Sequence, residues 1–191
     1  RVIPNGIDTS VFSIMPDVIR RKDQVLCVGQ VYGLKNQHRL IEVTGRLGVK
    51  LVIIGKPPPK HGAYYDYCRK IAHRNVVFKG FLPQDELRFH YAESKVHALP
   101  SWFETTGLSS LEAGAMGCRL VVGEGGDTHE YFDGNASFCQ AEDLQSIESA
   151  LTAELGRENS TGFRDLILRR YTWEAAARET LLAYQYMLGN G

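Results

Sequence analysis

Short apolar segments alternate with helix-length segments of mixed polarity along most of this chain. This alternation is typical of repeated strand–helix–strand units, whose parallel strands form one sheet with helices on both faces. The segment Leu51–Ile54 is apolar at every position, as expected for a strand that is covered on both sides. The pattern therefore predicts an α/β fold: a Rossmann-like three-layer sandwich with a mostly parallel sheet of about six strands, plus C-terminal helices.

The individual elements can be placed from the same pattern. Strands are predicted at Val25–Val28, Lys50–Ile54, Val76–Lys79, Val96–Leu99, Arg119–Val122 and Ala136–Cys139. Helices are predicted at Lys35–Leu47, Tyr64–Ala72, Pro83–Glu93, Leu108–Met116, Leu144–Leu155, Thr161–Arg170 and Trp173–Leu188. We expect residues 1–24 to form a lead-in segment, residues 25–170 the Rossmann-like domain, and residues 171–191 a closing helix.

Glycines mark the ends of several predicted strands, at positions 29, 55, 80 and 123. Glycine allows the tight turns that are needed where a strand leaves the sheet, and ligands of open α/β folds bind at this carboxyl edge. The segment Lys56–Gly62 contains three consecutive prolines and predicts an irregular surface loop. No G-x-G-x-x-G pattern follows the first strand, which disfavours a dehydrogenase.

The composition excludes several classes of function. Basic and acidic residues balance at 22 each, so the chain lacks the basic excess of a nucleic-acid-binding domain. No apolar run is long enough to span a membrane. The four cysteines form no C-x-x-C pair, which favours a reduced, cytoplasmic protein over a disulfide or zinc framework. The chain begins at Arg1 rather than Met, so we expect a fragment or a processed product.

Two carboxylates, Glu104 and Glu112, flank the start of the predicted helix Leu108–Met116. A helix N-terminus carries free N–H groups and a partial positive charge, and it attracts anions such as phosphate. Carboxylates beside a phosphate would repel it, but they accept hydrogen bonds from sugar hydroxyls. The segment therefore indicates a ligand with both phosphate and sugar. The alternative is that both residues only complement the helix dipole.

Several short motifs in a fixed order give the chain a family resemblance. They are Val2–Asp8, Val28-Gly29 with Lys35, Val76–Phe81, the two glutamates separated by seven residues, Gly125-Gly126 with Glu130, and Tyr171–Glu174. In this combination the chain resembles the C-terminal, donor-binding half of retaining GT-B glycosyltransferases, the group 1 family of glycogen synthases, sucrose synthases and many mannosyltransferases. The resemblance covers nearly the whole chain. It implies one half of a GT-B fold, with residues 25–170 as the nucleotide-sugar-binding domain.

The resemblance implies roles for residues around the two-glutamate motif. Glu104 would be the catalytic residue, close to the hydroxyls of the donor sugar, and Glu112 would bind the ribose. Backbone N–H groups at Gly107 and Leu108 would hold the distal phosphate. Lys35 would reach the diphosphate as a flexible point charge, although a solvated lysine at the start of a helix is the simpler interpretation of that residue alone.

Two more donor-binding positions are expected from the resemblance. The backbone of Gly80–Leu82 would read the nucleobase, with Phe81 either beside the base or serving as a hydrophobic cap on the sheet. Gln30 stands where the family usually has arginine, and an amide can hydrogen-bond a phosphate but cannot neutralise it. The chain has no D-x-D pair, so we expect neither a metal nor a cofactor, with Lys35 and the helix dipole neutralising the diphosphate.

The implied activity is transfer of a hexose from a nucleoside diphosphate sugar, with retention, to an acceptor sugar or lipid held by the missing N-terminal half. The fragment alone is expected to bind donor weakly and not to catalyse transfer. It should contact neither nucleic acid nor membrane, and any peripheral membrane association of a cytoplasmic parent protein would come from the missing half. Two alternatives stay open: a non-catalytic nucleotide-sugar-binding module, which Gln30 supports, and an unrelated doubly wound domain that binds another nucleotide.

Overall fold

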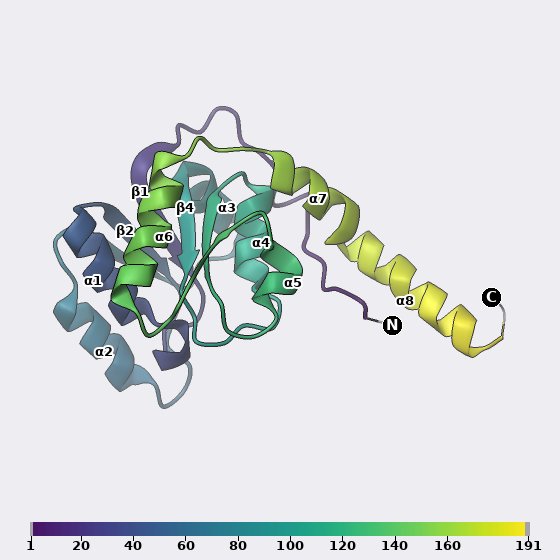
Figure 1. Cartoon of the computed structure of the whole chain (residues 1–191), viewed down its shortest axis with the longest axis horizontal. Coiled ribbons are helices and arrows are strands. Elements are labelled where there is room, and N and C mark those ends of the chain that lie inside the picture. Colours follow the sequence, from purple (N-terminus) through teal and green to yellow (C-terminus); the bar gives the residue numbers. More distant parts are fainter. Residues whose placement is uncertain (1, 190–191) are drawn as a thin grey trace.

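The computed structural model describes residues 2–189. Arg1, Asn190 and Gly191, at the ends of the expected lead-in segment and closing helix, lie outside the described residues. One sheet runs through the centre with the strand order β3-β2-β1-β4-β5-β6, and all of its strand pairs are parallel (Figure 1). The strands are β1 (Arg21–Val28), β2 (Lys50–Ile54), β3 (Val76–Gly80), β4 (Ser94–Leu99), β5 (Arg119–Gly123) and β6 (Ser137–Cys139). The predicted fold class is confirmed.

Helices cover both faces of this sheet (Figure 1). They are α1 (Gln37–Leu47), α2 (Gly62–Ile71), α3 (Gln84–Glu93), α4 (Leu108–Ala115), α5 (Thr128–Phe132), α6 (Leu144–Gly156), α7 (Gly162–Arg170) and α8 (Trp173–Met187), with a 3-10 turn at Gly33–Lys35. Buried side chains of α1, α2 and α6 pack on one face, and those of α3, α4, α5 and α7 pack on the other. The chain thus forms the three layers expected from its alternating pattern.

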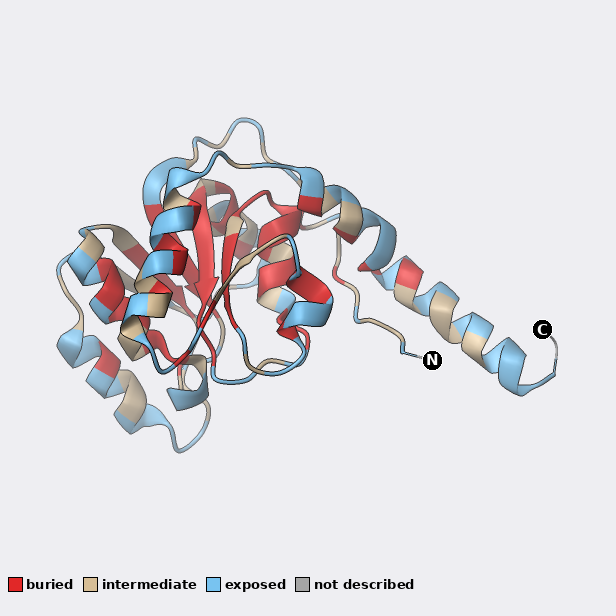
Figure 2. Ribbon diagram, in the orientation of Figure 1, coloured by how far each residue is buried: buried red, intermediate tan, exposed pale blue. Residues whose placement is uncertain are grey.

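The sheet separates two hydrophobic clusters, one on each face (Figure 2). Successive strand residues point to opposite faces, so Leu26 and Val28 of β1 join one cluster while Val25 and Cys27 join the other. This two-sided burial explains the continuous apolar stretches Val25–Val28 in β1 and Leu51–Ile54 in β2. All four cysteines are buried free thiols.

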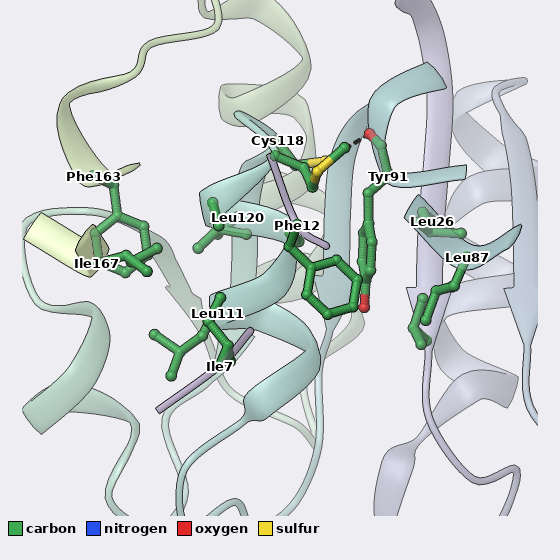
Figure 3. Packing of buried hydrophobic residues seen from close by; sticks show 14 of the residues in the cluster. Ile7, Phe12, Leu26, Leu87, Tyr91, Leu111, Cys118, Leu120, Phe163 and Ile167 are labelled. Carbon is green, nitrogen blue, oxygen red and sulfur yellow. Dashed lines mark hydrogen bonds between the residues drawn. The ribbon is translucent and has the colours of Figure 1, made fainter. Parts of the chain in front are cut away.

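The lead-in segment is part of the first cluster. Phe12 is fully buried, and its ring packs edge-on against Tyr91 of α3 with centroids 5.8 Å apart (Figure 3). The Ile7 N–H donates to the Tyr171 carbonyl oxygen at 2.8 Å. A Cβ atom on Gly6 would lie 2.3 Å from the Thr172 carbonyl oxygen, so only glycine permits this approach. The segment is therefore fixed against the junction between α7 and α8.

The structure differs from the prediction at several element boundaries and adds one helix. Strand β1 begins at Arg21 rather than Val25, because its first three residues are exposed and polar and give no apolar signal. Helix α1 begins at Gln37, and Lys35 lies in the preceding 3-10 turn instead of opening the helix. Asn36 separates the two with a left-handed φ of 60°, and its side-chain amide donates to the Pro100 and Ala141 carbonyl oxygens. Helix α5 was not predicted, because five residues are too few to show a helical period.

The closing helix α8 points away from the body of the molecule (Figure 1). Ala175 is its buried residue within the described chain. Large apolar side chains remain exposed along it: Trp173, Leu181, Leu182, Tyr184, Tyr186 and Met187. No helix within residues 2–189 is both long and apolar enough to cross a bilayer.

Candidate functional site

The candidate site lies at the carboxyl edge of the sheet, where the strand order reverses between β1 and β4. Loops diverge at such a point and leave room for a ligand. Two adjoining hollows open there, with volumes of about 400 and 380 Å³. The apolar hollow is lined by Val28, Gly29, Gln30, Ile54, Gly55, Lys56, Pro57, Pro58, Pro59, Phe81, Leu82 and Leu87. The polar hollow is lined by Asn5, Val28, Gly29, Gln30, Tyr32, Lys35, Leu99, Glu104, Thr105, Thr106, Gly107, Leu108 and Ser109.

Main-chain contacts hold the loops between the two hollows. The Gly29 N–H donates to the Ile54 carbonyl oxygen at 3.0 Å, and the Gly55 N–H donates to the Gly80 carbonyl oxygen at 2.7 Å. A Cβ on Gly55 would lie 1.9 Å from the Gly29 carbonyl oxygen. The loops after β1, β2 and β3 therefore touch backbone to backbone, which the glycines at the strand ends make possible.

The apolar hollow has rigid walls. The segment Pro57–Pro59 forms one side, and Phe81, with 69% of its surface exposed, lies on another. Proline rings and an aromatic ring offer flat apolar surfaces that suit a planar heterocycle. From the sequence alone, the three prolines predict only an irregular surface loop. Their position directly after β2, at the carboxyl edge of a parallel sheet, was the signal that could have placed them in the site.

Lys35 and Glu104 meet in the polar hollow. The Lys35 ammonium forms an ion pair with Glu104, and the Ser101 hydroxyl donates to Glu104 Oε1 at 2.8 Å. The two charged side chains are only 17% and 11% exposed. Lys35 is the one cation among the described lining residues of this hollow. The ion pair thus places a positive charge and a hydroxyl-binding carboxylate next to each other.

The N-terminus of α4 completes the polar hollow. Gly107 caps the helix in a left-handed conformation with φ 64°, and Leu108 and Ser109 follow it along the wall. The first N–H groups of a helix have no partner inside the helix, so they can bind an anion. Asn5 Nδ2 donates to Thr106 Oγ1 at 2.7 Å, which ties the lead-in segment to the same loop. No spacing in the sequence links Asn5 to a residue 101 positions later.

The glycine-rich loop after β5 fixes the backbone of Glu104. The Glu104 N–H donates to the Gly125 carbonyl oxygen at 3.1 Å, and the Asp127 N–H donates to the Glu104 carbonyl oxygen at 2.9 Å. A Cβ on Gly126 would lie 2.0 Å from the Glu104 carbonyl oxygen. A Cβ on Gly125 would lie equally close to the Trp102 carbonyl oxygen, at 2.0 Å. The backbone of Glu104 is therefore held by Gly125 and Gly126, two positions where a side chain would clash.

Glu112 lines neither hollow and is half-buried on α4. The Tyr91 hydroxyl donates to its Oε2 at 2.8 Å. Burial raises the pKa of Glu112 to about 7, although the Tyr91 hydrogen bond acts in the opposite direction. Leu87 precedes Tyr91 by one turn and lines the apolar hollow, and Leu108 precedes Glu112 by one turn and lines the polar hollow. The Tyr91–Glu112 pair thus lies about one helical turn from each hollow.

A buried histidine connects the end of β1 with α4. His97 of β4 is fully buried, and burial lowers its pKa to about 3, so the ring stays neutral. The Val28 N–H donates to His97 Nε2 at 3.4 Å, which places the ring proton on Nδ1, 3.4 Å from Ser110 Oγ. Among residues 2–189, no group of three or more His, Cys, Asp or Glu residues could hold a metal ion.

A comparison with known families decides what this arrangement belongs to. The family described as "Glycosyl transferases group 1" matches residues 22–155, which include both hollows except for Asn5. The chain belongs to the group 1 glycosyltransferase family. Its architecture and the order of its motifs agree with the resemblance drawn from the sequence.

Individual relatives in this family share between a quarter and a third of their aligned residues with the chain. An uncharacterized glycosyltransferase of Methanocaldococcus jannaschii is 26% identical over 97% of the chain and 53% of its own length. A GDP-mannose-dependent alpha-(1-6)-phosphatidylinositol monomannoside mannosyltransferase of Mycobacterium tuberculosis is 29% identical over 67% of the chain and 39% of its own length. The chain thus spans about half or less of these relatives. Anabaena Alr3699/HepE in complex with UDP-glucose superposes with a TM-score of 0.84 at 15% identity, covering 97% of the chain and 57% of HepE, which shows the fold.

The structure brings most of the predicted site residues of this family member together. Those that line the two hollows are Gln30, Lys35, Phe81, Glu104, Gly107 and Leu108. Gln30 is exposed and lies where the hollows meet. Glu112 is set back against Tyr91 instead of lining a hollow. Sequence reasoning missed three contributors to the site: Asn5, Pro57–Pro59 and Tyr91.

Proposed function

We propose that this chain is the donor-binding half of a retaining glycosyltransferase that moves a hexose from a nucleoside diphosphate sugar to an acceptor bound by another domain. One observation carries the proposal: an apolar hollow with flat walls continues into a polar hollow that holds a lysine, a carboxylate and a helix N-terminus. A nucleoside diphosphate sugar has the same sequence of parts, from planar base through ribose and diphosphate to a polyhydroxylated ring.

Each part of the donor has a matching wall. The base would lie between Pro57–Pro59 and Phe81 in the apolar hollow. The ribose would lie where the hollows meet, with its hydroxyls directed to Glu112. The diphosphate would lie on Lys35 and on the first N–H groups of α4. The sugar would then reach the Glu104 carboxylate, which accepts hydrogen bonds from hydroxyls.

The transfer chemistry follows from these positions. The bond from the anomeric carbon to the distal phosphate breaks, and negative charge grows on the leaving diphosphate. Lys35 and the α4 N-terminus stabilise that charge with groups already in place, so neither a metal nor a cofactor is needed. In front-face attack the acceptor oxygen bonds to the anomeric carbon on the side from which the phosphate leaves, which gives retention, and the leaving phosphate takes the acceptor proton. Because the acceptor sugar or lipid would bind to another domain, the fragment alone should bind donor without catalysing transfer.

Calorimetric titration with UDP, GDP and ADP, followed by the matching hexose conjugates, tests the proposal. One relative is GDP-mannose-dependent and one structural neighbour holds UDP-glucose, so both bases belong in the series. We expect saturable binding of one base. Lys35→Ala should weaken it about tenfold by removing a charge-assisted contact to the diphosphate. Lys70→Ala, on the exposed face of α2, is the control and should leave it unchanged. A folded sample that binds none of these nucleotides contradicts the proposal.

A non-catalytic nucleotide-sugar-binding module is the second candidate, and Gln30 is the observation that favours it. The residue lies where the hollows meet but brings no charge, and the lysine of the polar hollow is already paired with Glu104. We expect Gln30→Arg to tighten binding of nucleoside diphosphates about tenfold and to leave nucleoside binding unchanged, because only the diphosphate gains a cation. Titration of the wild type and of Gln30→Arg with a nucleoside and with its diphosphate measures this difference. If the intact protein carrying Gln30 transfers sugar, the non-catalytic candidate is excluded.

A further inference from the structure

Tyr91 is a fully buried tyrosine with one polar side-chain contact, its hydrogen bond to Glu112. Its ring is fixed on several sides. Figure 3 shows it between Phe12 on one side and Leu26 and Leu87 on the other. The His97 ring lies 5.8 Å from it, centroid to centroid. A ring packed this tightly has one orientation, so its hydroxyl is delivered to one place.

The hydroxyl of Tyr91 stays protonated at neutral pH. Burial, together with the neighbouring Glu112 carboxylate, raises the pKa of the phenol well above its usual range. In the 2.8 Å hydrogen bond the Tyr91 hydroxyl donates and Glu112 Oε2 accepts. Within the described residues, Glu112 makes no other side-chain hydrogen bond, so its second oxygen is available to a ligand. A hydrogen bond to one oxygen of a carboxylate can therefore orient the other oxygen toward a ligand.

We infer that Tyr91 is a positioning residue for donor binding: its hydroxyl holds Glu112 Oε2 so that Oε1 faces the ribose hydroxyls. This inference rests on the proposed function of the site. It gives the molecule a reason to bury a hydroxyl in the middle of an apolar cluster, where a phenylalanine would pack as well.

The same hydrogen bond favours the ionised form of Glu112, because it lowers a pKa that burial raises. An ionised carboxylate accepts hydrogen bonds from both ribose hydroxyls, and a donor to that ionised form favours it. Arg20 is a charged group beside the pair, but its guanidinium donates to the Tyr91 carbonyl oxygen at 3.4 Å and not to the hydroxyl or to Glu112. His97 stays neutral because burial lowers its pKa to about 3, and burial raises the pKa of the Cys27 and Cys118 thiols. Burial raises the pKa of Glu112, and the Tyr91 hydrogen bond is the contact that lowers it.

The variant Tyr91→Phe tests this inference, because it keeps the ring and removes only the hydroxyl. We would measure the affinity for the nucleoside diphosphate sugar that binds the wild type, between pH 6 and pH 9. The diphosphate of such a conjugate does not titrate in this range. We expect binding about tenfold weaker at pH 7 and a profile displaced to higher pH, since Glu112 would ionise less readily. An affinity profile that matches the wild type overturns the inference.

Two further measurements separate positioning from a general loss of packing. Tyr131→Phe removes another buried tyrosine hydroxyl, in α5, and should leave the profile unchanged. Carbon-13 NMR of the glutamate carboxyls, without ligand, should show the titration of Glu112 moving to higher pH in Tyr91→Phe alone. Absence of nucleotide binding by the wild type would overturn the proposed function together with this inference. Normal wild-type binding with an unmoved Glu112 titration would overturn the inference alone.

Discussion

Placing a single methyl group at position 126 is expected to disable the site. In Gly126→Ala the new Cβ would lie 2.0 Å from the Glu104 carbonyl oxygen, and residue 126 has a φ of 90°, which side chains rarely adopt. Relief requires the loop after β5 to move away from Glu104, which breaks the hydrogen bonds from Glu104 to Gly125 and from Asp127 to Glu104. We expect a loss of about 3 kcal/mol in the free energy of unfolding and donor binding weakened about tenfold or more.

Gly134→Ala is the matched control for this change. Gly134 also has a left-handed φ, of 72°, but no atom lies within 4 Å of a Cβ placed there. Backbone strain alone should cost about 1 kcal/mol at that position and leave donor binding unchanged. Urea unfolding and nucleotide titration of both variants measure the two effects. Equal losses in the two variants would show that strain, not the contact with Glu104, makes position 126 sensitive.

Replacing Glu112 by glutamine is expected to stabilise the fold at pH 8 by about 3 kcal/mol while weakening donor binding about tenfold. Burial raises the pKa of Glu112 to about 7 in the folded protein, from 4.5 for an ordinary glutamate. The folded state therefore binds this proton more tightly than the unfolded state does. In the wild type, the stability contributed by the protonated Glu112 carboxyl is fully present below pH 4.5 and is lost as the pH rises through 7. Glutamine stays neutral and keeps an oxygen for the Tyr91 hydroxyl.

The pH dependence is the signature of this effect. The stability advantage of Glu112→Gln should be large at pH 8 and shrink toward zero near pH 4.5, where the wild-type carboxyl is itself protonated. Glu86→Gln, an exposed change on α3, should give no comparable gain at either pH. Urea unfolding of the three proteins across this range makes the comparison. A glutamine variant that is less stable than the wild type at pH 8 would contradict the assignment of Glu112 as a strained, function-bearing carboxyl.

The sequence was sufficient to predict the framework because a sheet covered on both faces leaves a strong signal. All six strands overlap their predicted positions, and β1, β2, β3 and β5 each contain a run of three or more apolar residues. The signal fails where burial is absent or the element is short. Arg21–Asp23 extend β1 with exposed charges, and Thr128–Phe132 form a helix of five residues. Neither segment has enough periodicity to be recognised.

The candidate site was predictable only where its residues follow strands or begin a helix. Lys35, Glu104 and Gly107 lie in such places, and the fold brings them into one hollow. Tyr91 does not: it lies near the end of α3, and only the packing of α3 beside α4 brings it to Glu112. From its sequence neighbours Tyr91 is an ordinary core residue. Its contact depends on side-chain directions that no local pattern encodes.

The carboxyl edge of the sheet has a consequence for how this protein can be redesigned. Its loops are joined by main-chain hydrogen bonds, from Gly29 to Ile54, from Gly55 to Gly80 and from Glu104 to Gly125. Main-chain groups are the same in every residue, so this frame depends on its glycines and on little else in the local sequence. Side chains that only line the frame, such as Lys56 and Phe81, can be exchanged without dismantling it. Substitutions of these lining side chains can therefore alter base preference separately from the main-chain geometry that holds the diphosphate.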